Sequence, residues 1–293
     1  MTNGVPQYIS LPNWQIFVQR YNFFCIYQKN IVTLCPKWIS CSGSKPVCAR
    51  NGYLAPVLNR FVAEMEEKQH IGQLFDRIAS TYDGLNHGLS LNIDRRWRRK
   101  TVACMAPAKH VLDVAIGTAD LTIEMLRRGK AEQVTGLDLS DQMMAIGEEK
   151  VAKCQISNVQ FVHGNAQSMP FADASFDGVT CAFGCRNFQN LDEGLREMYR
   201  VLKPGGQVTI LEFSYPSRRY IRALYDFYFT HVLPTIGRIV SRDKTAYTYL
   251  NKSVKSFCWG EAFVQHMHDA GFINEHFEPL TFGIATIYTA NKQ

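Results

Sequence analysis

Short apolar runs alternate with amphipathic segments along most of the chain. The clearest apolar run is predicted as a strand at 110–115, within the stretch VLDVAIGTADL at 111–121. Residues 121–128 then have the pattern of a helix. A buried strand that leads through a turn of small residues into a helix is the usual start of the nucleotide site in a doubly wound α/β fold. We therefore expect a ligand at this turn.

The same alternation predicts the other elements of the chain. Further strands are expected at 134–139, 159–163, 176–183, 207–213, 272–277 and 281–289, and helices at 66–78, 93–105, 141–153, 191–202 and 261–270. We predict turns at 80–88 and at Lys-Pro-Gly-Gly, 203–206. Strands that alternate with helices indicate a parallel sheet with both faces covered.

Two segments depart from this rhythm. Residues 1–64 are rich in aromatic residues and cysteine, contain no Asp and keep neither a helical nor a strand period. We expect an N-terminal extension that is poorly ordered or not native to the protein, with Met65 as an alternative start. Residues 65–293 are expected to form the catalytic domain, in which the Tyr- and Phe-rich stretch 214–257 is a helical insert.

Composition removes several functional classes. The net charge is +6, but residues 1–64 hold six basic residues and one acid, so the remaining chain carries only +1. That balance gives no support to nucleic-acid binding. The nine cysteines are scattered without a C-x-x-C pair, which favours reduced thiols in a cytoplasmic protein. No apolar run reaches the ~18 residues of a transmembrane helix.

The turn at 116–119 predicts a site for a nucleotide-like ligand, and S-adenosylmethionine (SAM) would suit it. Backbone N–H groups at Gly117 and Thr118, with the helix start behind them, suit the methionine carboxylate of that ligand. Asp113 ends the first strand, where it would accept from the ligand's ammonium group. Asp138 ends the next strand, where an acid commonly binds ribose hydroxyls, although a capping Asp has the same pattern.

A single glycine in the turn argues against a dinucleotide. The motif G-x-G-x-x-G, which brings a pyrophosphate close to the backbone, is missing. Asn165 and Ala166 follow the third strand, where they could contact an adenine amine, although Asn165 alone is also typical of a turn.

These residues resemble the ubiquinone/menaquinone biosynthesis methyltransferase family from about residue 66 to 290. VLDVAIGTADL resembles the first SAM-binding motif, TGLDLSDQMM the second, residues 164–206 the third and fourth, and LEFSYP the end of the fifth strand. AFGCRNF and LTFGIATIY are more specific, because generic class I methyltransferases lack them.

The resemblance implies a fold and an activity. The fold is an α/β class I SAM-dependent methyltransferase, Rossmann-like, with a seven-stranded sheet of order 3-2-1-4-5-7-6, an antiparallel last strand and helices on both faces. The activity is C-methylation of demethylmenaquinol to menaquinol, or of the corresponding polyprenyl benzoquinol in ubiquinone biosynthesis. The family's SAM contacts correspond to Thr118, Asp138, Asn165 and Ala166.

Two positions depart from the family pattern. Ala119 stands where many members have glycine, and we expect little loss because an alanine can start a helix. Ala182 replaces a serine that contacts SAM in some members, so that contact is not carried over.

The reaction needs no metal, because the sulfonium already activates the methyl group. A ring hydroxyl must ionise, and Arg186 in FGCRN is the first candidate to stabilise the phenolate or orient a water. Its alternative role is a structural salt bridge to a helix. Asn187 is expected to position the loop. Tyr82 and Asp83 are expected to close over the site, with Asp83 or His87 as proton acceptor, although such residues in a turn are often structural.

The insert 214–257 is expected to line the binding site of the isoprenoid tail, although core packing would explain its apolar side chains equally well. These side chains are Tyr225, Phe227, Tyr228, Phe229, Val232 and Leu233. The basic run at 95–100 is either a solvated helix face or a contact with anionic lipid headgroups. We expect a cytoplasmic enzyme that touches the membrane surface transiently to reach a polyprenyl quinol. A peripheral position at the inner face of the membrane and a homodimer are left open.

Other functions remain as alternatives. They are a SAM methyltransferase for another small molecule, an NAD-dependent oxidoreductase, which the missing G-x-G-x-x-G weakens, and a non-catalytic SAM-fold binding module. The GTAD variant of the turn and the likeness to bacterial members favour menaquinone over ubiquinone.

Overall fold

The computed structural model describes the backbone of residues 8–11, 14–19, 23–28, 31–36, 71–90, 92–232 and 244–293. The chain divides into two units, Met1–His70 and Ile71–Gln293. In the first unit four strands pair antiparallel in chain order: β1 (Tyr8–Leu11), β2 (Trp14–Gln19), β3 (Phe23–Gln28) and β4 (Ile31–Pro36). The residue pattern of 1–64 did not predict these strands. Whether this segment is native to the protein stays a prediction.

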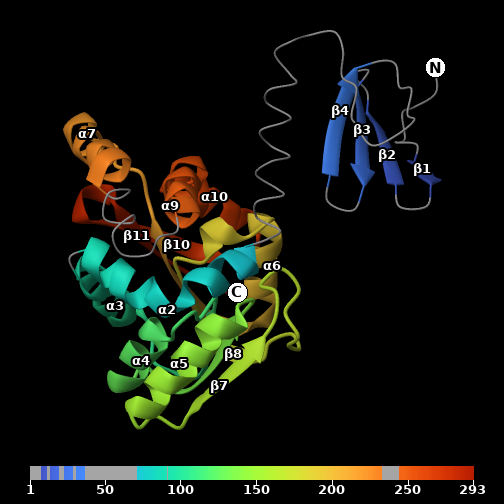
Figure 1. The fold of residues 1–293 in the computed structure, drawn as a ribbon. Helices are drawn as coiled ribbons and strands as arrows, with labels where there is room; N and C mark the ends of the chain where they lie inside the picture. Colours follow the sequence, from blue (N-terminus) through green and yellow to red (C-terminus); the bar gives the residue numbers. More distant parts are fainter. Residues whose placement is uncertain are drawn as a thin grey trace. The chain divides into compact units, whose positions relative to one another are not determined.

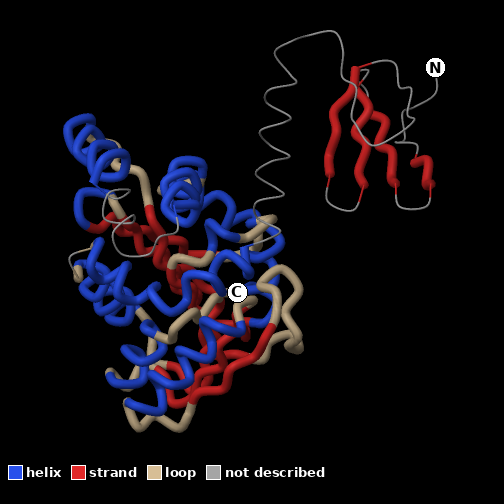
Figure 2. Tube along the Cα trace, in the orientation of Figure 1, coloured by secondary structure: helices blue, strands red, loops and turns tan. Residues whose placement is uncertain are grey.

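The second unit is built on a seven-stranded sheet between two layers of helices (Figures 1 and 2). Its strands are β5 (Ala108–Val114), β6 (Ala131–Asp138), β7 (Val159–His163), β8 (Phe176–Ala182), β9 (Leu202–Phe213), β10 (Ile273–Leu280) and β11 (Ala285–Asn291). The spatial order is β10-β11-β9-β8-β5-β6-β7, and β11 runs antiparallel to both neighbours. Numbered within this sheet and read from the other edge, this is the expected order 3-2-1-4-5-7-6.

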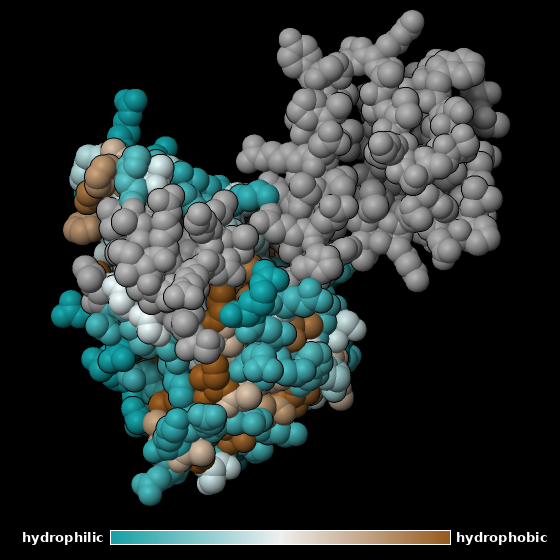
Figure 3. All heavy atoms as spheres, viewed as in Figure 1, coloured by the Kyte–Doolittle hydropathy of each residue, from teal (hydrophilic) through white to brown (hydrophobic). Residues whose placement is uncertain are grey.

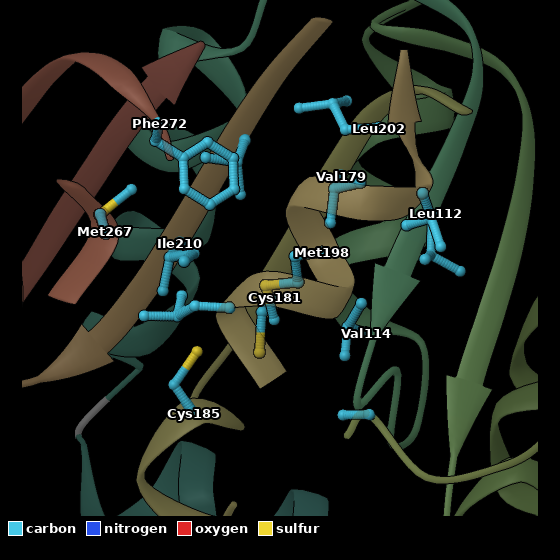
Figure 4. Packing of buried hydrophobic residues seen from close by; sticks show 14 of the residues in the cluster. Leu112, Val114, Val179, Cys181, Cys185, Met198, Leu202, Ile210, Met267 and Phe272 are labelled. Atoms are coloured by element: carbon cyan, nitrogen blue, oxygen red, sulfur yellow. The ribbon is translucent and has the colours of Figure 1, made fainter. Parts of the chain in front are cut away.

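Helices cover both faces of the sheet, as predicted. Helices α3 (Ile93–Cys104), α4 (Asp120–Arg127) and α5 (Asp141–Lys153) lie on one face, and α6 (Leu191–Val201) and α10 (Glu261–Asp269) on the other. Successive strand residues divide between the two layers, since Val111 packs with α3 and α4 whereas Leu112 packs with α6 and α10. Figure 4 shows the second layer's core, with Cys181 and Cys185 among apolar side chains.

Helix α2 (Ile71–Leu89) corrects the turn predicted at 80–88. The polar residues and glycines of that stretch resemble a turn, but the backbone stays helical because α2 packs along α5. Gly84 lies on the exposed side of α2, where a glycine only lowers helix propensity. The first residues of the helix predicted at 66–78 lie outside the described residues.

The turn predicted at 203–206 is a bulge inside β9. Phe176 of β8 pairs with Leu202, and Gly178 pairs with Gln207, so four residues of β9 stand opposite one residue of β8. A Cβ at Gly206 would lie 2.8 Å from the carbonyl oxygen of Asp177. The glycine therefore permits the close approach of the two strands. In the sequence, the same glycines predicted a turn that ends one element before the next begins.

The C-terminal strand starts later than predicted. Thr281–Gly283 form a short 3-10 turn, η3, and β11 begins at Ala285. Thr281 and Phe282 have φ values of +46° and +60°, which no extended strand allows. The β-branched composition of 281–289 predicted a strand and gave no sign of this turn.

The predicted helical insert is present in its described parts. They are α7 (Arg219–Phe227), the π-helical turn η2 (Tyr228–Val232) and α9 (Lys244–Ser256). Tyr225 of α7 and Val254 of α9 form a small apolar cluster beside Phe213 of β9. Within the described residues no helix combines the length and the apolar character that crossing a bilayer requires.

Candidate functional site

The turn after β5 has an unusual backbone. Ala115, Gly117 and Ala119 have φ values of +56°, +55° and +63°, whereas the residues between them do not have positive φ values. Alternation between right- and left-handed residues turns successive N–H groups toward one concave side, which suits an anion. Ala119 precedes α4 without a side-chain cap. The expectation of little loss at Ala119 did not include this conformation, in which an alanine is strained whereas a glycine is not.

Asp138, at the end of β6, contacts this turn. Its carboxylate accepts hydrogen bonds from the backbone N–H of Gly117, at 2.8 Å, and of Ser140, at 3.0 Å. Desolvation raises the pKa of Asp138 despite these hydrogen bonds. The Ser140 hydroxyl accepts from the N–H of Met143 at 3.1 Å and so caps α5. The ends of β5 and β6 thus form one polar edge.

Asp113 lies behind that edge. Its side chain is buried, and its two oxygens accept hydrogen bonds from the hydroxyls of Thr122, at 2.6 Å, and Thr180, at 3.0 Å. Burial raises the pKa of Asp113 to about 6. The carboxylate therefore joins β5, α4 and β8, and its contact with a ligand's ammonium group stays a prediction.

Asn165 and Ala166 follow β7 in a tight turn. The Asn165 side-chain oxygen accepts from the N–H of Gln167 at 2.9 Å, and Asn165 forms an isolated bridge with Ser168. Ala166 is buried. Asn165 thus has the turn-forming contacts weighed above, at the end of the strand next to β6.

Helix α2 makes polar contacts with the turn after β5, residues 115–119, which we call the donor turn. Asp83 accepts from the Thr118 hydroxyl at 2.6 Å and from Lys150 Nζ at 2.8 Å, and Lys150 also pairs with Asp120. Burial favours the neutral form of Asp120, but the charges of Arg98 and Lys150 prevail and lower its pKa. The structure therefore brings Asp83 to the turn at Thr118, where it is already paired with a cation.

His87 and the basic run on α3 belong to the same network. His87 Nδ1 lies 2.7 Å from Asp94 Oδ2, and Arg98 pairs with Asp94 and lies 3.5 Å from Asp120. Arg98 is buried, so it belongs neither to a solvated face nor to a lipid contact, whereas Arg95 and Arg96 are exposed. Ion pairs thus account for the buried Asp94, the half-buried Asp120 and His87 at this place.

A possible cation site overlaps this network. Asp83, His87 and Asp120 offer ligand atoms within 4.8 Å of one another. Lys150 already lies within hydrogen-bond distance of both carboxylates. A positive charge is thus supplied by the protein itself.

Arg186 is the central residue at the end of β8. It belongs to the 3-10 turn η1 (Cys185–Asn187), and only 5% of its surface is exposed. Its Nη1 donates to Glu212 Oε1 at 2.9 Å, while its backbone N–H donates to Glu212 Oε2 at 3.1 Å. Its guanidinium lies 5.1 Å from the centre of the Phe213 ring. The partner is on strand β9, not on a helix as the structural alternative assumed.

The charge of Arg186 is secured in spite of its burial. Burial alone would lower its pKa, but the Glu212 carboxylate together with Tyr82 and Tyr249 outweighs burial, and the pKa of Arg186 is raised. Its Nε is buried and has no hydrogen-bond partner among the described residues. The side chain is therefore a fixed cation whose Nε–H remains available as a donor.

Aromatic side chains from separate elements surround Arg186. Tyr82 of α2 and Tyr249 of α9 lie close enough to contribute to its raised pKa, and Arg186 in turn acts on the pKa of Tyr225 in α7. Asn187 accepts from the Tyr249 hydroxyl at 3.0 Å and donates to the carbonyl of Phe183 at 3.3 Å. The predicted Arg186, Asn187 and Tyr82 are thus brought together.

The cation and the donor turn are neighbours. A Cβ at Gly184, two residues before Arg186, would lie 2.6 Å from the Cβ of Ala115. The loop that carries the cation therefore packs directly against the turn after β5.

Sequence reasoning missed Glu212, Lys150 and Tyr249. An acid at the end of the apolar strand Val208–Leu211 signals a buried partner, so Glu212 was detectable. Lys150 and Tyr249 carry no such signal, because a lysine on a helix and a tyrosine in an aromatic-rich insert are ordinary. Phe227 is exposed, and the side chains of Phe229, Val232 and Leu233 lie outside the described residues.

Comparison with solved structures addresses the fold. A SAM-dependent methyltransferase of Thermotoga maritima matches with a TM-score of 0.55 and 18% identity, over 76% of this chain and 100% of that one. The [4+2]-cyclase SpnF matches with a TM-score of 0.56 and 18% identity, over 77% of this chain and 96% of that one. The class I SAM-dependent methyltransferase fold is confirmed.

Comparison of sequences is more specific. Demethylmenaquinone methyltransferase of Bacteroides fragilis is 44% identical over 230 residues, which cover 78% of this chain and 94% of the relative. Ubiquinone/menaquinone biosynthesis C-methyltransferase UbiE of Geotalea daltonii is 45% identical over 231 residues, 78% of this chain and 98% of the relative. The model of the ubiE/COQ5 methyltransferase family matches residues 63–292. The chain therefore belongs to the ubiE/COQ5 methyltransferase family, and it is a SAM-dependent methyltransferase.

Proposed function

We propose that this enzyme transfers the methyl group of SAM to a ring carbon of demethylmenaquinol and so forms menaquinol. The observation that carries the proposal is Arg186, a buried cation that Glu212 fixes next to the donor turn. The name and the 44% identity of the Bacteroides fragilis relative support the choice of acceptor.

The ends of β5 and β6 fit the methyl donor. The concave turn at Gly117 and Thr118 presents N–H groups to a carboxylate, and Asp138 lies where ribose hydroxyls are usually bound. Asn165 and Ala166, beyond β7, are the proposed adenine contacts. Asp113 acts indirectly, by holding Thr122 and Thr180. SAM, when bound, supplies an electrophilic methyl group.

The protein must make a ring carbon nucleophilic. Ionisation of a quinol hydroxyl raises the electron density on the neighbouring carbon, and a fixed positive charge in a site with little water favours the ionised form. Arg186 provides that charge, and its Nε provides a donor for the phenolate or for a bridging water. Tyr82 and Tyr249, which act on the pKa of Arg186, would lie beside the quinol ring. The tail lies along the insert, where Tyr225 is buried.

The proton of the quinol hydroxyl needs an acceptor. Asp83 and His87 are both engaged over the donor turn, Asp83 with Lys150 and His87 with Asp94. We propose that Asp83 or His87 takes the proton through water.

A second acceptor is the polyprenyl benzoquinol of ubiquinone biosynthesis. It is favoured by the 45% identity to the relative from Geotalea daltonii, whose name covers both quinones. Both acceptors are reduced rings with a prenyl tail, so the same cation and the same tail path serve them.

We further infer a place of work at the inner face of the cytoplasmic membrane. A prenylated acceptor resides in the bilayer, and the exposed Arg95 and Arg96 at the start of α3 suit anionic headgroups. A homodimer is a further proposal.

The direct test is methyl transfer with purified enzyme. SAM and either demethylmenaquinol or the demethylated benzoquinol are supplied under reducing conditions, and the products are identified by mass spectrometry. We expect menaquinol, and we expect a strain without the gene to accumulate demethylmenaquinone. An unchanged quinone profile in that strain would refute the proposed function.

A further inference from the structure

Helix α7 presents an apolar stripe to solvent. Tyr220, Leu224 and Phe227 are 65%, 67% and 58% exposed, and their spacing of four and three residues places them on one face of the helix. They are three of the five exposed large hydrophobic side chains among the described residues. Figure 3 shows tan and brown spheres over this helix, at the upper left. The clustering on one short helix is more than scattered surface apolarity.

The charges at the start of α7 have one sign. Arg218 and Arg219 are exposed, and the first turn contains no acid. Cations at a helix N-terminus oppose the helix dipole, so helix stability does not explain them. Asp226 is turned away from the stripe, because it accepts from Tyr215 at 2.6 Å and pairs with Lys255 at 2.8 Å. The exposed face therefore combines apolar side chains with positive charge.

The opposite face of α7 points to the candidate active site. Tyr225 is buried against Val254 of α9 and Phe213 of β9, and its pKa is affected by the charge of Arg186. Phe213 also stacks on the Arg186 guanidinium. A single helix thus separates the exposed stripe from the cation of the site.

A further exposed aromatic lies beside the start of the α7 segment. Phe282 is 68% exposed and has a φ of +60°, a conformation that is unfavourable for a bulky residue. Its neighbour Gly283 lies against Pro216: a Cβ at Gly283 would lie 3.8 Å from the Cα of Pro216. The exposed ring of Phe282 thus lies near the segment that carries Arg218 and Arg219.

We propose that the stripe Tyr220–Leu224–Phe227, with Arg218 and Arg219, is the surface on which the enzyme docks to an anionic lipid bilayer. The inference deepens the proposed function, because the acceptor it assumes is a bilayer lipid. Three side chains bury about 500 Å² at most, below the ~800 Å² per partner of a stable dimer. A bilayer needs no complementary surface, and its negative headgroups match the arginines.

The test is co-sedimentation of the full chain with vesicles of phosphatidylcholine, with and without phosphatidylglycerol. Tyr220→Ser/Leu224→Ser is expected to weaken binding about tenfold. The apolar control Tyr220→Phe/Leu224→Met should bind like the wild type. Arg218→Gln/Arg219→Gln should lose about tenfold on anionic vesicles only, and less at high salt. The matched charge control Arg127→Gln/Arg128→Gln, at the C-terminal end of α4, should change little.

Turnover separates docking from chemistry. The Ser variant should keep its rate on a water-soluble quinol without a prenyl tail, and lose about tenfold on the prenylated quinol in vesicles. A retained rate on the tail-less quinol also shows that the Ser variant is folded. If the Ser variant does not fold, the two quinols are compared with the variant Arg218→Gln/Arg219→Gln. Methylation of neither quinol, with stripe-dependent vesicle binding, would reject the proposed function and support the surface.

Two results would overturn the docking surface. One is equal vesicle binding by wild type and Ser variant, including no binding by either. The other is a loss of dimer mass in the Ser variant, by sedimentation, without a change in vesicle binding, since a second copy would then cover the stripe.

Discussion

At the residue scale the main feature is one buried ion pair. Arg186 and Glu212 are 5% and 0% exposed, and loss of either partner leaves a charge without compensation in the interior. Removal of one partner of such a pair costs about 3–5 kcal/mol of stability. An effect of Arg186 on catalysis must therefore be separated from an effect on folding.

The double change Arg186→Ala/Glu212→Gln makes that separation. It removes both charges, so the variant should recover most of the stability lost in Arg186→Ala. Turnover should stay about a hundredfold below wild type in both variants, because the cation that favours the phenolate is missing. SAM affinity, measured by calorimetry, should be unchanged. Near-normal turnover in either variant would contradict the role of Arg186.

Asp113 predicts a dependence of stability on pH. Burial raises its pKa to about 6 in the folded state, above the ~3.9 of an unfolded chain. The folded state thus holds this proton more tightly, so the stabilising contribution is full below pH ~4 and is lost as the pH rises through ~6. Its size is about 3 kcal/mol.

Asp113→Asn should remove that dependence. Urea denaturation at pH ~4.5 and pH ~7 should show a wild-type loss of about 2 kcal/mol relative to the variant as the pH rises. Asp94 and Asp120 have lowered pKa values, so their opposite effect falls below this window. A parallel response of wild type and variant would show that Asp113 is ionised throughout.

At the element scale the start of α4 is strained by its own sequence. Ala119 occupies a left-handed position that glycine adopts freely. The strain is retained next to the ligand turn, where a backbone with fixed N–H directions is useful.

Ala119→Gly should therefore stabilise the protein by about 0.5–1 kcal/mol, measured by chemical denaturation. The matched control is Ala145→Gly in the exposed middle of α5, where right-handed geometry makes glycine cost about 1 kcal/mol. The same sign for both changes would count against strain at Ala119.

At the scale of the whole molecule the chain consists of two compact units, of which the second holds the candidate site. The family match begins at residue 63, and the compact unit of the fold covers Ile71–Gln293. All described partners of Arg186, Asp138 and Asp83 belong to that unit.

A chain that starts at Met65 should therefore keep the fold and the activity. We expect a melting temperature within about 3 °C of the full chain, since a change of 1 kcal/mol moves a domain of this size by about 2–4 °C. Turnover on a tail-less quinol should be the same for both. A loss of either property would show that residues 1–64 support the enzyme.

The sequence predicted most elements because each has a local period. Residues 141–153 and 159–163 were predicted with the bounds that the structure has. The errors fall where tertiary contacts override local preference, as in α2, which is helical through glycines because it packs on α5. Asp138 and Gly117 could be paired from sequence, because the carboxyl ends of parallel strands meet at one edge.

By itself the sequence determined the alternating elements, the single-glycine turn and the cation in FGCRN, since these depend on neighbours along the chain. Only the tertiary structure decided which groups hold that cation and which face of α7 remains outside. Arg186 meets Glu212 across 26 residues, and Asn187 meets Tyr249 across 62. Such pairs depend on strand order and on the folding of the insert over the sheet, which no local period encodes.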